Sequence, residues 1–238
     1  MRRGFTLAEL MVYMFIALLA ALTVHTLFNV GNSASRATTS AYLVSGNTET
    51  AIRWLRRDLG ETALSSIRVH PDAKGISFAA ARTVEDQELV ISKFGTPEWS
   101  KTVFYTLETE PGDKTASLVR WERPWPAAER DFLPHASSLM PSPIPSEAAK
   151  RKVVLHNLAA PNTDIPGVGN SGPSGGFDVQ FLRRLGGEDG AEQLTPDNPS
   201  QGNPHDNTKL VDVTLKLVLG SGSHTSYYGV HLRVAPQY

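Results

Sequence analysis

The chain has 238 residues, no cysteine and a formal net charge of −1. The lack of cysteine excludes disulfides and thiolate chemistry, and the near-zero net charge provides no overall attraction to nucleic acid. About 170 residues follow the helical segments described below, which is enough for one modest hydrophobic core.

The chain begins with a long apolar segment. No Asp, Glu, Lys or Arg occurs from Leu10 to Ser35, and Leu10 to Phe28 is almost wholly apolar. As a helix, these 19 residues would span about 28 Å, close to the hydrocarbon core of a bilayer, about 30 Å. A cleaved secretory signal is one alternative, but its apolar region should be shorter, about 7–15 residues. A plain membrane anchor is another. It leaves Glu9 unexplained, because an ionisable residue in a spanning segment usually has a partner.

The residues in front of this segment carry a specific motif, Arg-Gly-Phe-Thr-Leu-Ala-Glu, at positions 3–9. The motif resembles the class III signal of type IV pilins and type II secretion pseudopilins. The resemblance implies that a prepilin peptidase cleaves between Gly4 and Phe5 and methylates the new amino terminus at Phe5. Arg2 and Arg3 would belong to the basic leader, which stays on the cytoplasmic side.

Glu9 has a physical role in such a protein. Removal of the leader leaves a charged amine in an apolar setting, which costs much less beside a carboxylate than alone. Glu9 is therefore expected to pair with the amine of a neighbouring subunit and to set the axial register of the assembly. The resemblance implies other pilin or pseudopilin subunits, an inner-membrane assembly platform and membrane lipid as partners. It also implies a single-pass bacterial inner-membrane protein with its carboxyl-terminal domain in the periplasm.

A second helical segment is predicted directly after the apolar one. No proline interrupts this segment. Apolar residues recur in it at helical spacing, at Ile52, Leu55, Leu59, Ala63 and Ile67. We predict one helix from Thr6 to Ser66, apolar on all sides first and amphipathic over residues 31–67. Glu49 precedes Arg53 in the favourable i,i+4 order, whereas Arg57 and Glu61 have the reverse order. The basic residues 53–57 are interpreted as a solvated face.

The remaining sequence alternates in short runs and predicts an antiparallel sheet. The predicted strands are Ile76–Ala80, Leu89–Phe94, Thr102–Glu108, Ala116–Glu122, Val153–Leu158, Phe177–Arg183, Lys209–Leu219 and Ser226–Val234. Residues 110–113 (Glu-Pro-Gly-Asp) predict a hairpin turn, and alternation places Leu215 in the core. Long loops are expected at 124–145, 161–176 and 186–207. The fold class is α+β, with a leader at 1–4, a transmembrane segment at 5–30, its helical continuation at 31–67 and a globular domain at 68–238.

Further similarities favour one branch of the family. Residues 51–59, which end in Asp58-Leu59, resemble the helical stretch of J-type minor pseudopilins, and residues 118–122 and 154–158 also resemble that branch. The segments between Leu158 and Phe177 and at 186–207 are longer than in the family. The resemblance implies a minor subunit of a pseudopilus that acts in protein secretion.

Enzymatic and ligand-binding alternatives have little support in the sequence. There is no Gly-x-Ser-x-Gly elbow and no phosphate loop, and no histidine spacing suggests zinc, so we expect no enzyme, no metal and no cofactor. Calcium binding is the alternative for the expected loop at 186–207, because carboxylates together with glycine and asparagine supply oxygen ligands. The candidate carboxylates are Glu188, Asp189, Asp197 and Asp206. A nucleic-acid partner is not expected, since no basic, aromatic-rich run occurs.

Two functional hypotheses of different class therefore stand. The first is a structural subunit of a pseudopilus or type IV pilus-like fibre. The second is a membrane-tethered ligand-binding module, or an adhesion or DNA-uptake pilin, in which the sheet domain captures a ligand and the apolar segment only anchors it.

Overall fold

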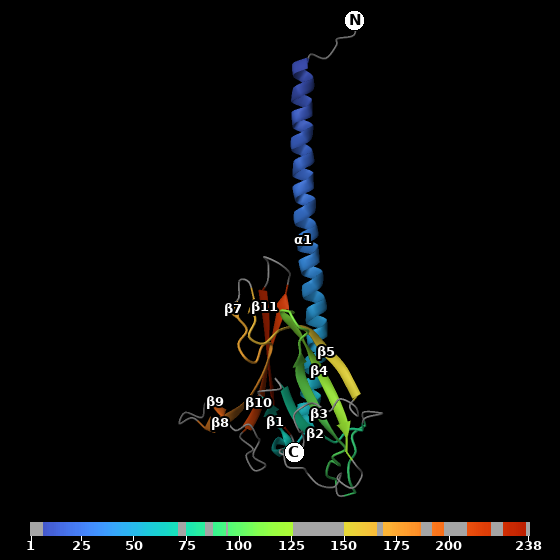
Figure 1. Ribbon diagram of the computed structural model, residues 1–238, viewed down its shortest axis with the longest axis vertical. Coiled ribbons are helices and arrows are strands. Elements are labelled where there is room, and N and C mark those ends of the chain that lie inside the picture. Colours follow the sequence, from blue (N-terminus) through green and yellow to red (C-terminus); the bar gives the residue numbers. More distant parts are fainter. Residues whose placement is uncertain are drawn as a thin grey trace. The chain divides into compact units, whose positions relative to one another are not determined.

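A computed structural model (Figure 1) describes most of the chain and divides it into two compact units, Met1–Ser45 and Gly46–Tyr238. The described residues are 7–70, 75–83, 88–93, 95–125, 150–165, 169–186, 192–197, 209–219 and 226–236. The first unit contains the beginning of the long helix α1, and the second contains the end of α1 and the strands.

Helix α1 extends over 54 residues, from Leu7 to Gly60, and continues through the glycines at 31 and 46. The prediction that it reaches Ser66 is wrong by its last turn, because residues 61–63 form a turn and a short 3₁₀ helix, η1, covers Leu64–Ser66. Short polar side chains account for the early end. The hydroxyl of Thr62 donates to the carbonyl of Ala79 at 2.6 Å, and the hydroxyl of Ser66 accepts from the N–H of Ala79 at 3.2 Å. Such hydroxyls offer the backbone alternatives to helical hydrogen bonds.

The last turns of α1 bury one face against the sheet. Ala51, Leu55 and Leu59 are fully buried, and their spacing of four places them on one side of the helix. Arg53 and Arg56 are exposed, as predicted for residues between the apolar positions. The amphipathic character of the whole stretch 31–67 stays a prediction.

The strands confirm a largely antiparallel sheet after one long helix, consistent with the α+β class. Within the described residues, nine strands form one sheet in the order β1-β2-β3-β4-β5-β10-β8-β9, with β11 paired to β10. The bounds are β1 Arg68–His70, β2 Gly75–Ala80, β3 Lys101–Glu108, β4 Thr115–Pro124, β5 Lys150–Ala159, β8 Phe177–Gly186, β9 Glu192–Asp197, β10 Lys209–Leu219 and β11 Ser226–Val234. A separate pair joins β6 (Asp164–Ile165) to β7 (Gly169–Asn170).

The alternation of apolar and polar residues in the sequence predicted most of these strands. Strands β10 and β11 have the predicted bounds, and β3 and β4 form the predicted hairpin, whose turn is closed by the N–H of Asp113 and the carbonyl of Glu110 at 3.0 Å. The prediction of a strand at 89–94 is wrong, because this segment contributes only isolated bridges, Arg82 to Leu89 and Ile91 to Pro97. Strands β1, β6, β7 and β9 were not predicted, and β9 lies within the expected loop 186–207. The expected loop 124–145 falls almost wholly outside the described residues.

The sheet divides where β10 meets two strands along one edge. β8 pairs with Lys209–Leu215 of β10, while β5 pairs with β10 at Leu217 alone, opposite Leu158. Gly176 precedes β8 at this junction. A Cβ there would lie 2.6 Å from both the Ala159 nitrogen and the Lys216 carbonyl oxygen. Only glycine therefore allows the three backbones to converge, and β5 diverges from β10 beyond this point.

The buried face of β10 provides a direct test of the core. Leu215 is fully buried, opposite Val230 of β11 and Phe177 of β8. We predict that Leu215→Asp lowers the free energy of unfolding by about 4 kcal/mol or more, because it removes apolar contacts and buries an unpaired charge. Urea unfolding of the full chain in detergent micelles, followed by tryptophan fluorescence, measures this. All four tryptophans lie in the second unit. An unchanged midpoint would show that Leu215 is not in the core.

Candidate assembly motif and buried charge cluster

The processing residues identified from the sequence lie outside the described part of the chain. Arg2, Arg3, Gly4 and Phe5 all precede Leu7, where the described residues begin. Glu9 lies in the first turn of α1 and is exposed. A carboxylate at this end of a helix is favourable because it faces the positive end of the helix dipole. Whether these five residues act together in processing and assembly remains a prediction.

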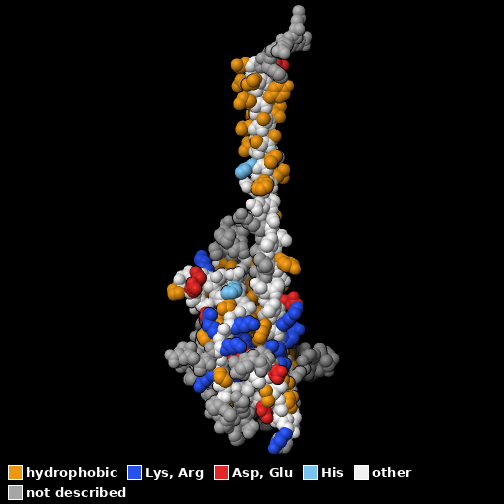
Figure 2. Space-filling view, turned by 90° about the vertical axis from the view of Figure 1, so that its right-hand side faces the viewer, with side chains coloured by type: hydrophobic (Ala, Val, Ile, Leu, Met, Phe, Trp, Pro, Cys, Tyr) orange, Lys and Arg blue, Asp and Glu red, His pale blue; other side chains and the backbone are white. Residues whose placement is uncertain are grey.

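The first part of α1 has the properties of a membrane anchor. The segment Leu7–Ser35 is both long enough and apolar enough to cross a bilayer. Its large apolar side chains are exposed along the helix (Figure 2). Its polar side chains bond within the helix. Thr23 donates to the Leu19 carbonyl at 2.8 Å, and Asn29 contacts His25 at 3.0 Å. Internal bonds of this kind lower the cost of polar groups in lipid.

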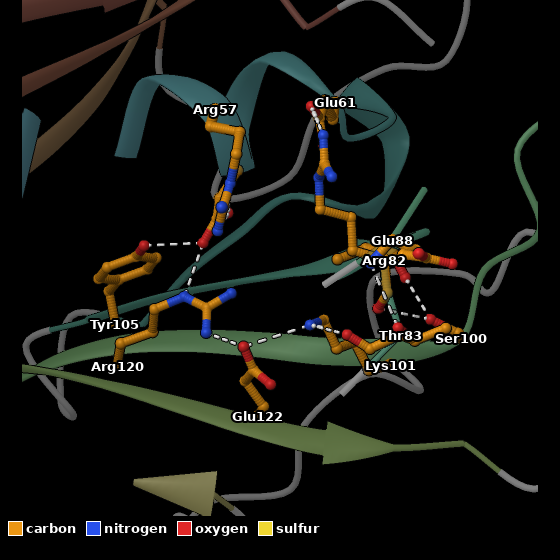
Figure 3. A network of polar contacts seen from close by, with 12 residues as sticks. Arg57, Glu61, Arg82, Thr83, Glu88, Ser100, Lys101, Tyr105, Arg120 and Glu122 are labelled. Carbon is orange, nitrogen blue, oxygen red and sulfur yellow. Dashed lines mark hydrogen bonds and ion pairs between the residues drawn. The ribbon is translucent and has the colours of Figure 1, made fainter. Parts of the chain in front are cut away.

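The second unit contains a buried charge cluster, centred on Asp58 at the end of α1 (Figure 3). One carboxylate oxygen, Oδ2, accepts from the Tyr105 hydroxyl at 2.8 Å and from Arg120 Nε at 2.7 Å. The other, Oδ1, accepts from Nε and Nη2 of Arg57 at 3.1 and 3.0 Å. Four hydrogen bonds thus satisfy a carboxylate that is only 5% exposed. They connect α1 to both β3 and β4.

The cluster extends along the same face of the sheet. Glu122 of β4 accepts from Arg120 and forms an ion pair with Lys101 of β3, with 3.2 Å between Nζ and Oε1. Lys101 Nζ also donates to the Thr83 carbonyl at 3.0 Å. The side chains of Lys101, Arg120 and Glu122 are at most 3% exposed. A substrate in solution cannot reach them, so the geometry favours a structural role for this cluster.

A second contact joins the end of α1 to the segment after β2. Arg82 donates to both carboxylate oxygens of Glu61, at 2.5 and 2.6 Å. Sequence spacing suggested Arg57 as the partner of Glu61, but Arg57 instead bonds Asp58. The predicted pair of Glu49 and Arg53 is confirmed, with 2.5 Å between Oε1 and Nη2.

Burial and neighbouring charge change the acidity of two groups in the cluster. Burial, with the nearby positive charge of Arg120, lowers the pKa of Lys101 from its ordinary value of 10.5 to about 7. Burial, followed by the negative charge of Asp58, raises the pKa of Tyr105 well above 10. Tyr105 therefore stays a neutral donor to Asp58 across the physiological pH range.

Three cations from different parts of the chain lie close to the ring of Trp54. The guanidinium of Arg57 lies 4.1 Å from the ring centroid, Arg120 lies 5.0 Å away, and Lys152 Nζ lies 4.1 Å away. These are cation–π distances. The interpretation of residues 53–57 as a solvated face is therefore only partly right, because Trp54 and Arg57 are half-buried. No pattern within residues 53–57 could identify Lys152 as a neighbour.

The calcium alternative falls mostly outside the described residues. Glu188, Asp189 and Asp206 are not described, and Asp197 is the last residue of β9. In the described part of the chain, no group of three or more His, Asp or Glu side chains is arranged to hold a metal ion.

Comparison with known proteins gives a match that is limited to the amino terminus. Residues 1–24 match the family described as the prokaryotic N-terminal methylation motif. No curated protein and no solved structure matches the chain. The motif supports the pilin-like class and implies processing by a prepilin peptidase and assembly with other pilin subunits. The apolar segment Leu7–Ser35 fits the membrane anchor of such a protein, and the motif suggests a structural rather than an enzymatic role.

The buried cluster predicts a large effect at Asp58. We predict that Asp58→Ala lowers the free energy of unfolding by about 3–5 kcal/mol, because buried Arg120 loses one of its two carboxylate partners and the buried Tyr105 hydroxyl loses this acceptor. Urea unfolding of the full chain in micelles measures the change. Glu49→Ala, which removes an exposed partner of Arg53 on the same helix, is the matched control and should not move the midpoint measurably. Equal effects of the two variants would contradict the structural role of Asp58.

The lowered pKa of Lys101 predicts a pH dependence with a definite sign. Between pH about 7 and about 10.5, the unfolded chain binds a proton at Lys101 that the folded chain does not hold. Stability should therefore rise as the pH rises through this window and should not change with Lys101 below it. We predict that unfolding measured from pH 7 to 9.5 shows this slope, and that Lys101→Met abolishes it. The upper limit avoids ionisation of tyrosines in the unfolded chain. A parallel slope in Lys101→Met would assign the pH dependence to another group.

Proposed function

We propose that this protein is a minor pseudopilin or pilin: a structural subunit of a periplasmic pseudopilus, or of a type IV pilus-like fibre, that acts in protein secretion. The observation that carries the proposal is the methylation motif over residues 1–24, which overlaps the apolar helical segment Leu7–Ser35. In this proposal the peptidase cleaves between Gly4 and Phe5 and methylates Phe5. The leader with Arg2 and Arg3 remains cytoplasmic, and the second unit lies in the periplasm.

Glu9 supplies the contact between subunits. Glu9 lies in the first turn of α1, four residues after Phe5, so a staggered neighbour could bring the amine of its own Phe5 to the Glu9 carboxylate. In lipid, the amine and the carboxylate each carry a cost that the pair largely removes. Assembly is therefore favoured over the isolated subunit, and the charge pair selects one axial stagger.

The J-type branch is the more specific form of the proposal. Asp58-Leu59 ends one of the stretches that carry that resemblance, and both side chains are buried at the contact of α1 with the sheet. A resemblance at these positions therefore concerns residues with a structural role. The inner-membrane assembly platform and the other minor subunits are the partners this form implies.

Substitution of Glu9 tests the assembly role. We predict that Glu9→Leu is cleaved and inserted normally, but is crosslinked to neighbouring subunits far less than the wild type. The reason is that the neighbour's amine loses its counter-charge. Glu9→Asp should retain part of the crosslinking and Glu9→Gln little, since charge is the relevant property. The measurement is crosslinking in isolated membranes, with a cleavage assay on the same samples.

Each result of this experiment bears on a different hypothesis. Equal crosslinking for Glu9→Leu and the wild type would reject the pairing. Absence of neighbours in both would favour the alternative of a membrane-tethered binding module. A deletion strain that keeps secretion and pili intact would contradict the proposed function as a whole.

A further inference from the structure

Among the described strands, the first half of β5 has a pairing partner on one edge only. β5 pairs with β4 along most of its length, but pairs with β10 at Leu158 alone. From Lys150 to Leu155, no other described strand covers its outer edge. The side chains of Lys150, Arg151 and Lys152 are exposed. An edge of this kind presents backbone N–H and C=O groups that a further strand can pair with.

The open edge is strongly cationic. It begins with three consecutive basic residues, and Arg123 on the neighbouring β4 is also exposed. Among the described residues, Lys152 lies over the ring of Trp54 and forms no ion pair with a carboxylate. Figure 2 faces the side on which β5 lies in Figure 1 and shows Lys and Arg side chains gathered there.

Among the described residues, the carboxylates near this edge do not bond Lys152 or Arg123. Asp58 and Glu122 are buried and already bonded to Arg57, Arg120 and Lys101. Glu108 bonds Arg151 at 2.6 Å, so Lys152 and Arg123 are the cations of this edge to which no described carboxylate bonds. Lys152 lies over the face of the Trp54 ring, and Arg151 lies over the face of the Trp121 ring. A carboxylate that approaches either cation can bind it while the cation stays in contact with the ring.

The same charge excludes a second copy of the chain as the partner. Two such edges placed side by side would bring lysines and arginines directly opposite one another, which destabilises a strand pair. Basic residues on an edge strand are a known protection against self-pairing. They leave the backbone groups available to a strand of opposite charge, so the edge discriminates between partners.

From these observations we infer that the Lys150–Leu155 edge of β5 binds an extended acidic segment of a different, neighbouring subunit, which adds to the sheet as a further strand. The backbone of the edge supplies the hydrogen bonds, and Lys150, Arg151 and Lys152 with Arg123 select the charge. This inference rests on the proposed function and names the chemistry of the partner. A nucleic acid would use the cations but not the backbone edge, so we take a peptide strand as the occupant.

The test uses the full chain in detergent micelles and a labelled nine-residue peptide in which glutamate alternates with valine or threonine. Two matched peptides separate the causes: one carries glutamine for glutamate, and one carries N-methyl groups on alternate peptide bonds. A single-stranded oligothymidylate of nine nucleotides represents nucleic acid. Fluorescence anisotropy gives the affinity, and hydrogen–deuterium exchange shows which backbone amides are protected.

We expect the acidic peptide to bind at least about tenfold more tightly than either matched peptide and to protect amides of β5. Lys152→Glu should weaken binding at least about tenfold with little effect on the midpoint of thermal unfolding, because residue 152 is exposed and exposed charges contribute little to stability. Lys114→Glu makes the same charge change at the exposed turn between β3 and β4 and is the control. It should bind as the wild type does.

Three results would overturn the inference. They are equal binding of the acidic and N-methylated peptides, protection of amides elsewhere but not in β5, and protection of this edge by the oligonucleotide but not the peptide. The binding assay is independent of processing and assembly. If the peptide fails to bind while Glu9-dependent crosslinking holds, the docking edge is rejected and the proposed function stands.

Discussion

The carboxylate of Asp58 is the contact on which the second unit depends. A buried charge is tolerated only when it is paired and its lone pairs are bonded. Here Tyr105, Arg120 and Arg57 provide four hydrogen bonds. Because Tyr105 and Arg120 are on adjacent strands, the interaction determines where the last turns of α1 lie on the sheet. Hydrophobic burial of Leu55 and Leu59 supplies attraction, but charge pairing supplies the position.

One helix therefore meets two different physical requirements. From Leu7 to Ser35 it exposes apolar side chains, and polar side chains such as Thr23 and Asn29 bond within the helix, which suits lipid. From Thr48 to Leu59 it buries one face against the sheet, which suits a folded domain in water. A pilin-like subunit needs both, because it must be held in a membrane and must also present a stable domain.

Local patterns in the sequence predicted the features that depend on local physics. The alternation in Lys209–Leu219 predicted a strand with the correct bounds and correctly placed Leu215 in the core, because one face of that strand is buried. The apolar run predicted the first part of α1, and the motif at residues 3–9 predicted the family match. In each case the pattern lies within one continuous stretch of about twenty residues or fewer.

The features that were missed depend on residues far apart in the chain. Asp58 and Arg120 are separated by 62 positions, so no local pattern pairs them. Strand β9 lies in a polar segment and is a strand because β8 offers it an edge. The helix ends at Gly60 rather than Ser66 because the hydroxyls of Thr62 and Ser66 bond to β2. The open edge of β5 likewise follows from where β10 stops pairing, which only the assembled sheet determines.

If the chain is a processed subunit of a pilin-like assembly, the mass of the mature protein will show the removal of its leader. The full-length gene product is isolated from membranes of its host and measured intact by mass spectrometry, beside a Gly4→Val variant in which a bulkier residue obstructs the peptidase. The account predicts a wild-type chain that begins at Phe5 and carries one added methyl group, and a variant that retains its whole leader from Met1 onward. A wild-type chain that keeps its leader, or one cleaved after the apolar segment, would contradict it.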